Sequence, residues 1–174
     1  MFPRLLDLAV LGLAAFAVLL PRADVKVQPG LQFDSERRLR VAELEAALEA
    51  KPGDPEATLE LADLLVDARR PDWALGPVAK ALVLHPKDHR LHSKRGVALA
   101  DHFEAGAAYE SVQKALELCE SGSSEPCTDP EHSRLVLLRN TLAKVRDIDM
   151  RADPNTAKER ILKALRPAHI PGSK

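Results

Sequence analysis

The apolar residues of this chain recur at intervals of three or four positions, which places them on one face of an α-helix. Residues 132–148 show the pattern most clearly, at Leu135, Leu138, Leu142, Val145 and Ile148. This segment follows Asp129-Pro130-Glu131, a combination that is typical of a helix start. The pattern therefore predicts a helical protein, with one long helix over residues 132–148.

Residues 5–20 form an apolar run that only Asp7 interrupts, and Arg4 and Arg22 bracket it. As a helix this run would be about 24 Å long, which is at the short end of a membrane span. The two arginines could reach opposite membrane interfaces and make up the difference. We therefore expect residues 1–23 to be an uncleaved membrane anchor.

Two other interpretations of this N-terminal segment stay open. Residues 15–17 have the small-x-small form of a signal-peptide cleavage site, although three further apolar residues follow them. A buried helix of a soluble protein is the third interpretation. Positive charge flanks both ends of the run and does not decide the orientation.

We expect a single-pass membrane protein whose soluble domain lies on the periplasmic or another extracytoplasmic side.

An internal repeat is visible in two similar segments, residues 46–57 and 80–91, whose prolines Pro52 and Pro86 lie 34 positions apart. With this period, small residues and aliphatic residues fall in register. The matching sets are Ala47, Ala81 and Ala115; Ala74 and Ala108; Leu44, Val78 and Val112; Leu65 and Leu99; and Ala62 and Gly96. Small residues suit helix backbones that approach closely, larger aliphatic residues fill the space between helices, and proline ends a helix.

This pattern resembles the tetratricopeptide repeat (TPR), a helix-turn-helix unit of 34 residues. Residues 55–88 match its signature at Leu61, Ala62, Leu65, Ala74, Val78, Ala81 and Pro86, and residues 89–122 match it at Gly96, Leu99, Ala108, Val112 and Ala115. Thr58, Arg95 and Glu120 depart from the signature. The resemblance covers about residues 38–166. It implies an all-α fold, a short TPR-like solenoid of helical hairpins preceded by a single N-terminal transmembrane helix.

The two ends of the array match less well. Residues 36–52 look like the second helix of a half-lost repeat, and Ala157, Ile161 and Ala164 again have second-helix spacing. We expect the helix over 132–148 to cap the array. The expected segments are 1–23, anchor or signal sequence; 24–36, linker; 37–122, TPR-like repeats; 123–130, loop; and 131–174, a C-terminal helical pair and tail.

The resemblance also implies a concave groove that binds an extended peptide or a partner helix. The family's groove positions correspond here to Glu56, Leu59, Asp63, Val66, Asp67, Arg90, Ser93, Lys94, Val97 and Asp101. One side would be acidic and the other basic. Arg90 and Lys94 match one basic pair of the clamp with which some members hold a terminal carboxylate, but Asp63 stands where that clamp needs Asn. A purely solubilising role for these charges is the alternative.

The stretch HPKDHRLH, residues 85–92, contains three histidines, and imidazole is a common metal ligand. In the repeat register His85 ends one unit, whereas His89 and His92 begin the next helix. We therefore expect a polar surface turn and no metal site.

Cys119 and Cys127 flank a short loop and are the only two cysteines. Outside the cytoplasm we expect them to form a disulfide, with two free thiols as the alternative. A zinc site made of these cysteines and His132 would fit no common ligand spacing.

The composition and the missing motifs argue against several classes of function. A net charge of -1 argues against a dedicated nucleic-acid binder. Aromatic residues are only 3%, so the core must be built from Ala, Leu and Val, which favours close-packed helices. The chain has no phosphate loop, no Gly-x-Ser-x-Gly and no His-Glu-x-x-His, so we expect no enzyme activity and no cofactor.

These observations lead to a membrane-anchored adaptor or scaffold that holds protein partners of a membrane complex. One alternative is a metal or redox protein that uses the histidines and cysteines, and the other is a small structural accessory subunit of a larger membrane protein complex. Such a subunit would permanently bury its helix faces, including Trp73 and Phe103 near the inter-helix turns.

Overall fold

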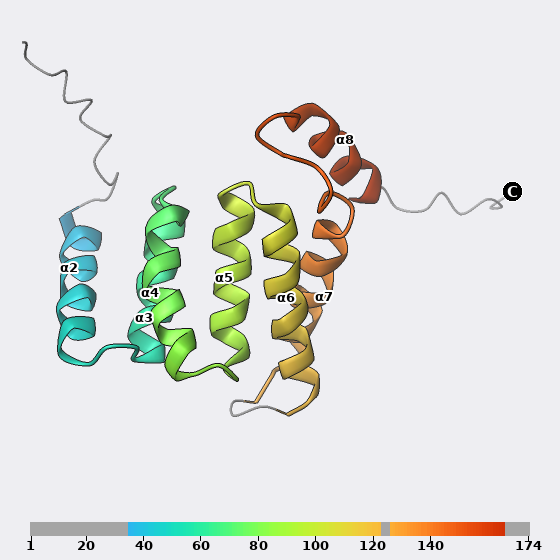
Figure 1. The fold of residues 1–174 in the computed structure, drawn as a ribbon. Helices are drawn as coiled ribbons and strands as arrows, with labels where there is room; N and C mark the ends of the chain where they lie inside the picture. Colours follow the sequence, from blue (N-terminus) through green and yellow to red (C-terminus); the bar gives the residue numbers. More distant parts are fainter. Residues whose placement is uncertain (1–34, 123–125, 166–174) are drawn as a thin grey trace, which may run out of the picture. The chain divides into compact units, whose positions relative to one another are not determined.

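The computed structural model describes residues 35–122 and 126–165, and within them the chain is all-α, as predicted (Figure 1). The described helices, in chain order, are α2 (Ser35–Ala50), α3 (Pro55–Asp67), α4 (Pro71–Leu84), α5 (His89–Asp101), α6 (Ala105–Glu120), α7 (Asp129–Leu142) and α8 (Pro154–Leu165). None of them is long and apolar enough to cross a membrane. The predicted anchor, residues 1–23, lies outside the described residues, and α2 begins inside the segment predicted as a linker.

α3 and α5 start where local sequence rules place them. α3 begins at Pro55, and the side chain of Asp54 accepts a hydrogen bond from the backbone N–H of Ala57 at 3.2 Å. In α5, Asp88 accepts from the backbone N–H of Arg90 at 2.9 Å. The two capping aspartates stand 34 positions apart, so the repeat is visible in how the helices begin.

The turns inside the two hairpins also share one geometry. Arg69, between α3 and α4, has φ 60°, and Phe103, between α5 and α6, has φ 67°. In both turns the N–H of the next residue donates to the carbonyl oxygen five positions back at 2.9 Å. This bond is the helix-ending pattern that needs a left-handed residue. Arg69 and Phe103 are again 34 positions apart, so the predicted period holds in the backbone.

The residues in register occupy equivalent places in the core. Val78 and Val112 are fully buried on α4 and α6, and so are the small residues one turn before them. Gly96 of α5 shows why a small residue recurs: a Cβ there would lie 3.3 Å from the carbonyl oxygen of Ala108 and clash with Val112. Ala47 is the exception, since it is exposed on α2.

The predicted helix over residues 132–148 is wrong at both ends. α7 begins at Asp129, where Thr128 and Glu131 form a capping box, and it ends at Leu142. The apolar spacing continues past the helix because Val145 and Ile148 still pack, from a series of tight turns, against the start of α6 and against α8. The apolar spacing therefore continues to Val145 and Ile148 because these side chains are packed, although α7 itself ends at Leu142.

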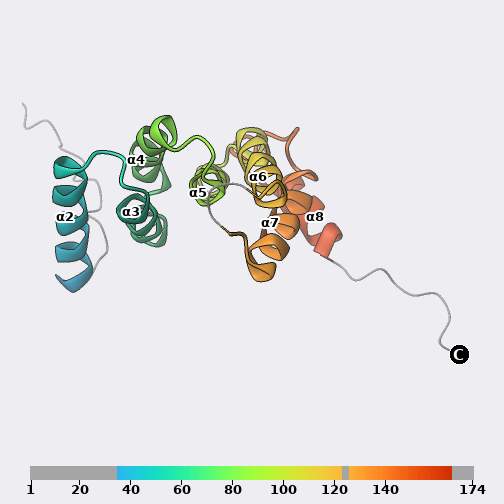
Figure 2. The ribbon, with the colours of Figure 1, turned by 90° about the horizontal axis from the view of Figure 1, so that it is seen from below.

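Successive helices from α2 to α7 pack against one another, and α3 also contacts α5. Figure 2 shows that α3, α5 and α7 lie on one side of this part of the chain, whereas α4 and α6 lie on the other. The first helices of the hairpins therefore share a face.

Candidate protein-interaction groove

A groove of about 460 Å³ lies on the face that α3, α5 and α7 share. Its lining residues are Glu56, Leu59 and Asp63 from α3; His89, Arg90, Ser93, Lys94 and Val97 from α5; and Glu131, Arg134, Leu135 and Leu138 from α7. Apolar side chains from all three helices contribute to it, and charged side chains lie among them. The groove thus combines an apolar surface with both signs of charge.

The structure brings together most of the predicted groove residues. Those that line the groove are Glu56, Leu59, Asp63, Arg90, Ser93, Lys94 and Val97. Val66 is not among its lining residues and packs instead against the core formed by α2, α3, α4 and α5. Asp67 and Asp101 are the last residues of α3 and α5, and both are exposed outside the groove.

The acidic and basic sides of the groove pair with each other. Arg90 Nη1 lies 2.7 Å from Glu56 Oε1, and these residues occupy the same position in consecutive repeats. Lys94 Nζ likewise pairs with an Asp63 carboxylate oxygen. Both basic residues of the clamp-like pair therefore already hold carboxylates of α3.

Arg90 is also fixed from its own turn. Its Nη2 lies 2.9 Å from Asp88 Oδ2, and its Nε donates to Oδ1 at 3.2 Å. Burial of the Asp88 carboxyl alone would raise its pKa, but hydrogen bonds from the Arg90 side chain and backbone outweigh this effect and lower it. The hydrogen bond to Asp88 in turn raises the pKa of Arg90, although burial opposes it. Asp88 is thus a helix cap that also holds Arg90 at the edge of the groove.

The sequence-based prediction missed the wall that α7 contributes. Leu135 is buried and Leu138 is half-buried, whereas Arg134 is exposed. The Thr128 backbone N–H donates to Glu131 Oε2 at 2.9 Å, and this bond, with that from the Thr128 hydroxyl, lowers the pKa of Glu131. The helical spacing of Leu135 and Leu138 is visible in the sequence, but the predicted groove positions end at Asp101 and include no residue of α7.

The predicted surface turn holds for part of the histidine stretch only. His85 is exposed, and His92 is half-buried with Nε2 3.0 Å from the carbonyl oxygen of Pro86. For His89 the prediction is wrong, since this residue is only 2% exposed. The reason is its place in the first turn of α5, close to Cys127 from the connection before α7 and to Glu131 from the first turn of α7. Tertiary packing therefore buries a residue that the local turn pattern leaves outside.

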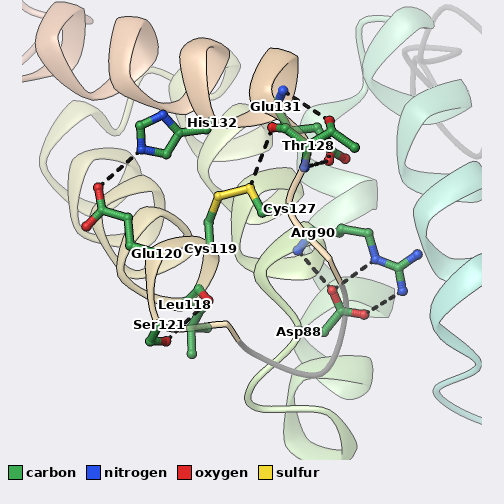
Figure 3. Close-up of a disulfide and its surroundings, with 10 residues drawn as sticks. All are labelled: Asp88, Arg90, Leu118, Cys119, Glu120, Ser121, Cys127, Thr128, Glu131 and His132. Carbon is green, nitrogen blue, oxygen red and sulfur yellow. Dashed lines mark hydrogen bonds and ion pairs between the residues drawn. A yellow bond between two sulfur atoms is a disulfide. The ribbon is translucent and has the colours of Figure 1, made fainter.

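Cys119, near the end of α6, and Cys127, just before α7, are joined in a disulfide with a Cα–Cα distance of 5.2 Å (Figure 3). This is the pairing that the sequence favoured. His132 points elsewhere: its Nε2 lies 3.3 Å from a carboxylate oxygen of Glu120. The histidine that lies beside Cys127 is His89.

A second hollow, of about 580 Å³, lies between α2, α3 and α4 and was not predicted from the sequence. Trp73 lines it and is 44% exposed, with the guanidinium of Arg70 3.8 Å from its ring centroid. Thr58 also lines it, and the buried hydroxyl of this residue has no hydrogen-bond partner among the described residues. This hollow is larger than the groove, but its lining residues all lie between Glu45 and Lys80, and none comes from α5 or α6.

No protein-family model, curated protein or solved structure matches the chain.

Proposed function

We propose that the chain is a membrane-anchored, TPR-like scaffold that holds an extended peptide or a helix of a partner protein in the groove. One observation carries this proposal: α3, α5 and α7, three alternate helices of the array, together line a single groove. Stacked helical hairpins commonly bind their partners on such a shared face. Residues 5–20 would anchor the scaffold, and the anchor would raise the local concentration of a partner in the same membrane.

The chemistry of the groove indicates what it would recognise. Leu59, Val97 and Leu138 offer contacts for apolar side chains spaced along a peptide. The pairs of Arg90 with Glu56 and of Lys94 with Asp63 offer both signs of charge. Partly exposed ion pairs contribute little to stability, so each partner charge can exchange with one of them at small cost. We therefore expect a mixed apolar and charged segment rather than a free C-terminal carboxylate.

The proposal is tested on the full-length protein, purified from its native membrane in mild detergent. Proteins that copurify are identified by mass spectrometry and then measured with two variants, Val97→Lys and Val83→Lys. Val97 is half-buried in the groove, whereas Val83 is 79% exposed on α4 outside it. We expect the partner to be lost from the Val97 variant and kept by the Val83 variant, with unchanged helical content in both. Equal retention by the two variants would exclude the groove as the binding site.

A permanent structural subunit is the second candidate, and the exposure of large apolar side chains favours it. Trp73 is 44% exposed and Phe103 is 56% exposed, both near the turns inside the hairpins. A subunit of this kind would copurify with its complex in fixed stoichiometry at high salt. Trp73→Ser and Phe103→Ser would then release it, whereas Val97→Lys would not.

A further inference from the structure

The imidazole of His89 is deeply buried. The residue is 2% exposed, and neither ring nitrogen has a hydrogen-bond partner within residues 35–122 and 126–165. Polar side chains this deeply buried are normally satisfied, because one ring nitrogen of a neutral histidine donates and the other accepts. An imidazole held in this way is available to a ligand that accepts its lone pair.

Other potential ligand atoms surround it. A ring nitrogen of His89, the Sγ atom of Cys127 and a carboxylate oxygen of Glu131 all lie within 4.8 Å of one another. The disulfide adds Cys119 to the same place. Figure 3 shows the disulfide and Glu131 where α6 and the start of α7 meet, with Arg90 nearby. The fold thus gathers one imidazole from α5, one sulfur atom from α6, one from the loop before α7 and one carboxylate from α7.

We propose that reduction of the Cys119–Cys127 disulfide turns this cluster into a zinc site. A dithiol reductant transfers two electrons and two protons to the disulfide and becomes a disulfide itself, which leaves two cysteine thiols. Zinc then displaces the two thiol protons, and both thiolates coordinate it together with a His89 nitrogen and a Glu131 oxygen. The intact disulfide withholds both sulfur ligands, so the site forms only in the reduced protein.

The geometry requires the ligand atoms to move by about 1–2 Å. Bond lengths of about 2.3 Å to sulfur and about 2.0 Å to nitrogen or oxygen put neighbouring ligand atoms of tetrahedral zinc some 3–4 Å apart. The present spread of up to 4.8 Å needs to contract by about 1 Å, and the two sulfur atoms must move apart to about 3.8 Å. Both cysteines are half-buried, which leaves a reductant access. The three anionic ligands exceed the charge of zinc by one.

The test is a metal titration of the full-length protein in detergent, using Co²⁺ as a spectroscopic probe and Zn²⁺ as competitor. One sample keeps the disulfide; the other is reduced with a dithiol that is removed before the titration. We expect the reduced protein to bind one equivalent of Co²⁺ with intense thiolate-to-metal absorption, which Zn²⁺ abolishes. Absence of that absorption, or equal binding by the oxidised sample, would overturn the proposal.

Three variants distinguish metal binding by the whole cluster from metal binding by the two thiols alone. His89→Leu keeps an apolar residue of similar size in the buried position, and Glu131→Gln keeps a residue that a capping box accepts. We expect each to weaken Co²⁺ binding at least about tenfold. His132→Ala is the matched control, because this histidine lies close in sequence but pairs with Glu120. Circular dichroism reports whether each variant folds. If His89→Leu does not fold, the Co²⁺ binding of Glu131→Gln tests the proposal. Unchanged binding by the folded His89 and Glu131 variants would show that the thiols bind metal without this cluster.

Discussion

At the scale of single residues, Arg69 and Phe103 stand out because both hold a left-handed backbone. This conformation costs a residue with a Cβ roughly 1–2 kcal/mol. Replacing exposed Arg69 by Gly removes that cost, although greater freedom of the unfolded chain offsets part of the gain. We expect Arg69→Gly to raise the free energy of unfolding by roughly 0.5–1 kcal/mol in urea titrations.

The matched control is Arg95→Gly, because Arg95 is also an exposed arginine but lies inside α5 with an ordinary helical backbone. There the same change should lower the free energy of unfolding by about 1 kcal/mol. Destabilisation of similar size in both variants would contradict the assignment of strain to the turn.

The Asp88 carboxylate makes the stability of the protein depend on pH. Its folded pKa is lowered, so its ionised form stabilises the protein above the unfolded pKa of about 3.9, and this contribution is lost as pH falls through the folded value. Asn caps helices as well as Asp does, so Asp88→Asn removes mainly the bonds of a charged carboxylate to Arg90. We expect a loss of roughly 1–3 kcal/mol at pH 7, measured by urea unfolding.

The difference between wild type and the Asp88 variant should shrink as the pH is lowered below 3.9 towards acid unfolding. Asp54→Asn provides the comparison, because Asp54 caps α3 but its ion-pair partner Lys51 is largely exposed. A smaller loss is expected there. A pH-independent effect of Asp88→Asn would show that the charge of Asp88 is not responsible.

At the scale of whole elements, the contact between α5 and α6 depends on Gly96. Ala normally favours a helix over Gly by about 1 kcal/mol, but here the added Cβ would clash with Val112 and press against backbone atoms of α6. We expect Gly96→Ala to lower the free energy of unfolding by roughly 1–3 kcal/mol, because the two helices must separate. Thermal unfolding followed by circular dichroism measures it.

Gly76 in α4 is the natural counterpart, since a Cβ there meets no atom within 4 Å among the described residues. Gly76→Ala should therefore stabilise the protein by about 0.5–1 kcal/mol. If both alanine variants stabilised the protein, the close approach of α5 and α6 would not constrain the fold.

At the scale of the whole molecule, α7 both completes the groove and covers the second hairpin. Leu135 and Leu142 are buried in one cluster with Val112 and Leu116 of α6. Removing residues 129–174 would expose that apolar face, and we expect thermal unfolding to shift down by more than about 10 °C. Unchanged unfolding of the truncated protein would exclude a capping role for α7.

Two single substitutions in α7 test its packing without removing residues 129–174. Leu142→Ala should cost about 2–5 kcal/mol because it leaves a cavity in the buried cluster. Leu137, on the same helix, is 61% exposed, so Leu137→Ala should stay within about 0.5 kcal/mol of wild type.

Much of the fold follows from neighbouring residues alone. Capping residues such as Asp88, the prolines at helix starts, and the 34-residue recurrence of small and aliphatic residues determine where the helices begin and which face of each is buried. The caps and prolines act within a few positions of each other, and the recurrence is a pattern of the sequence itself, so both are readable without the tertiary structure. Most of the groove positions on α3 and α5 were predicted from the resemblance to the tetratricopeptide repeat, not from local rules.

Only the tertiary structure decided the rest. It ended α7 at Leu142 while Val145 continued to pack, and it added α7 to the groove. It also buried His89 beside Cys127 and Glu131, residues that lie about forty positions further along the chain. Such contacts depend on how whole helices stack, which no local pattern encodes. The sequence therefore determined the helices and their repeat, whereas packing determined which side chains meet.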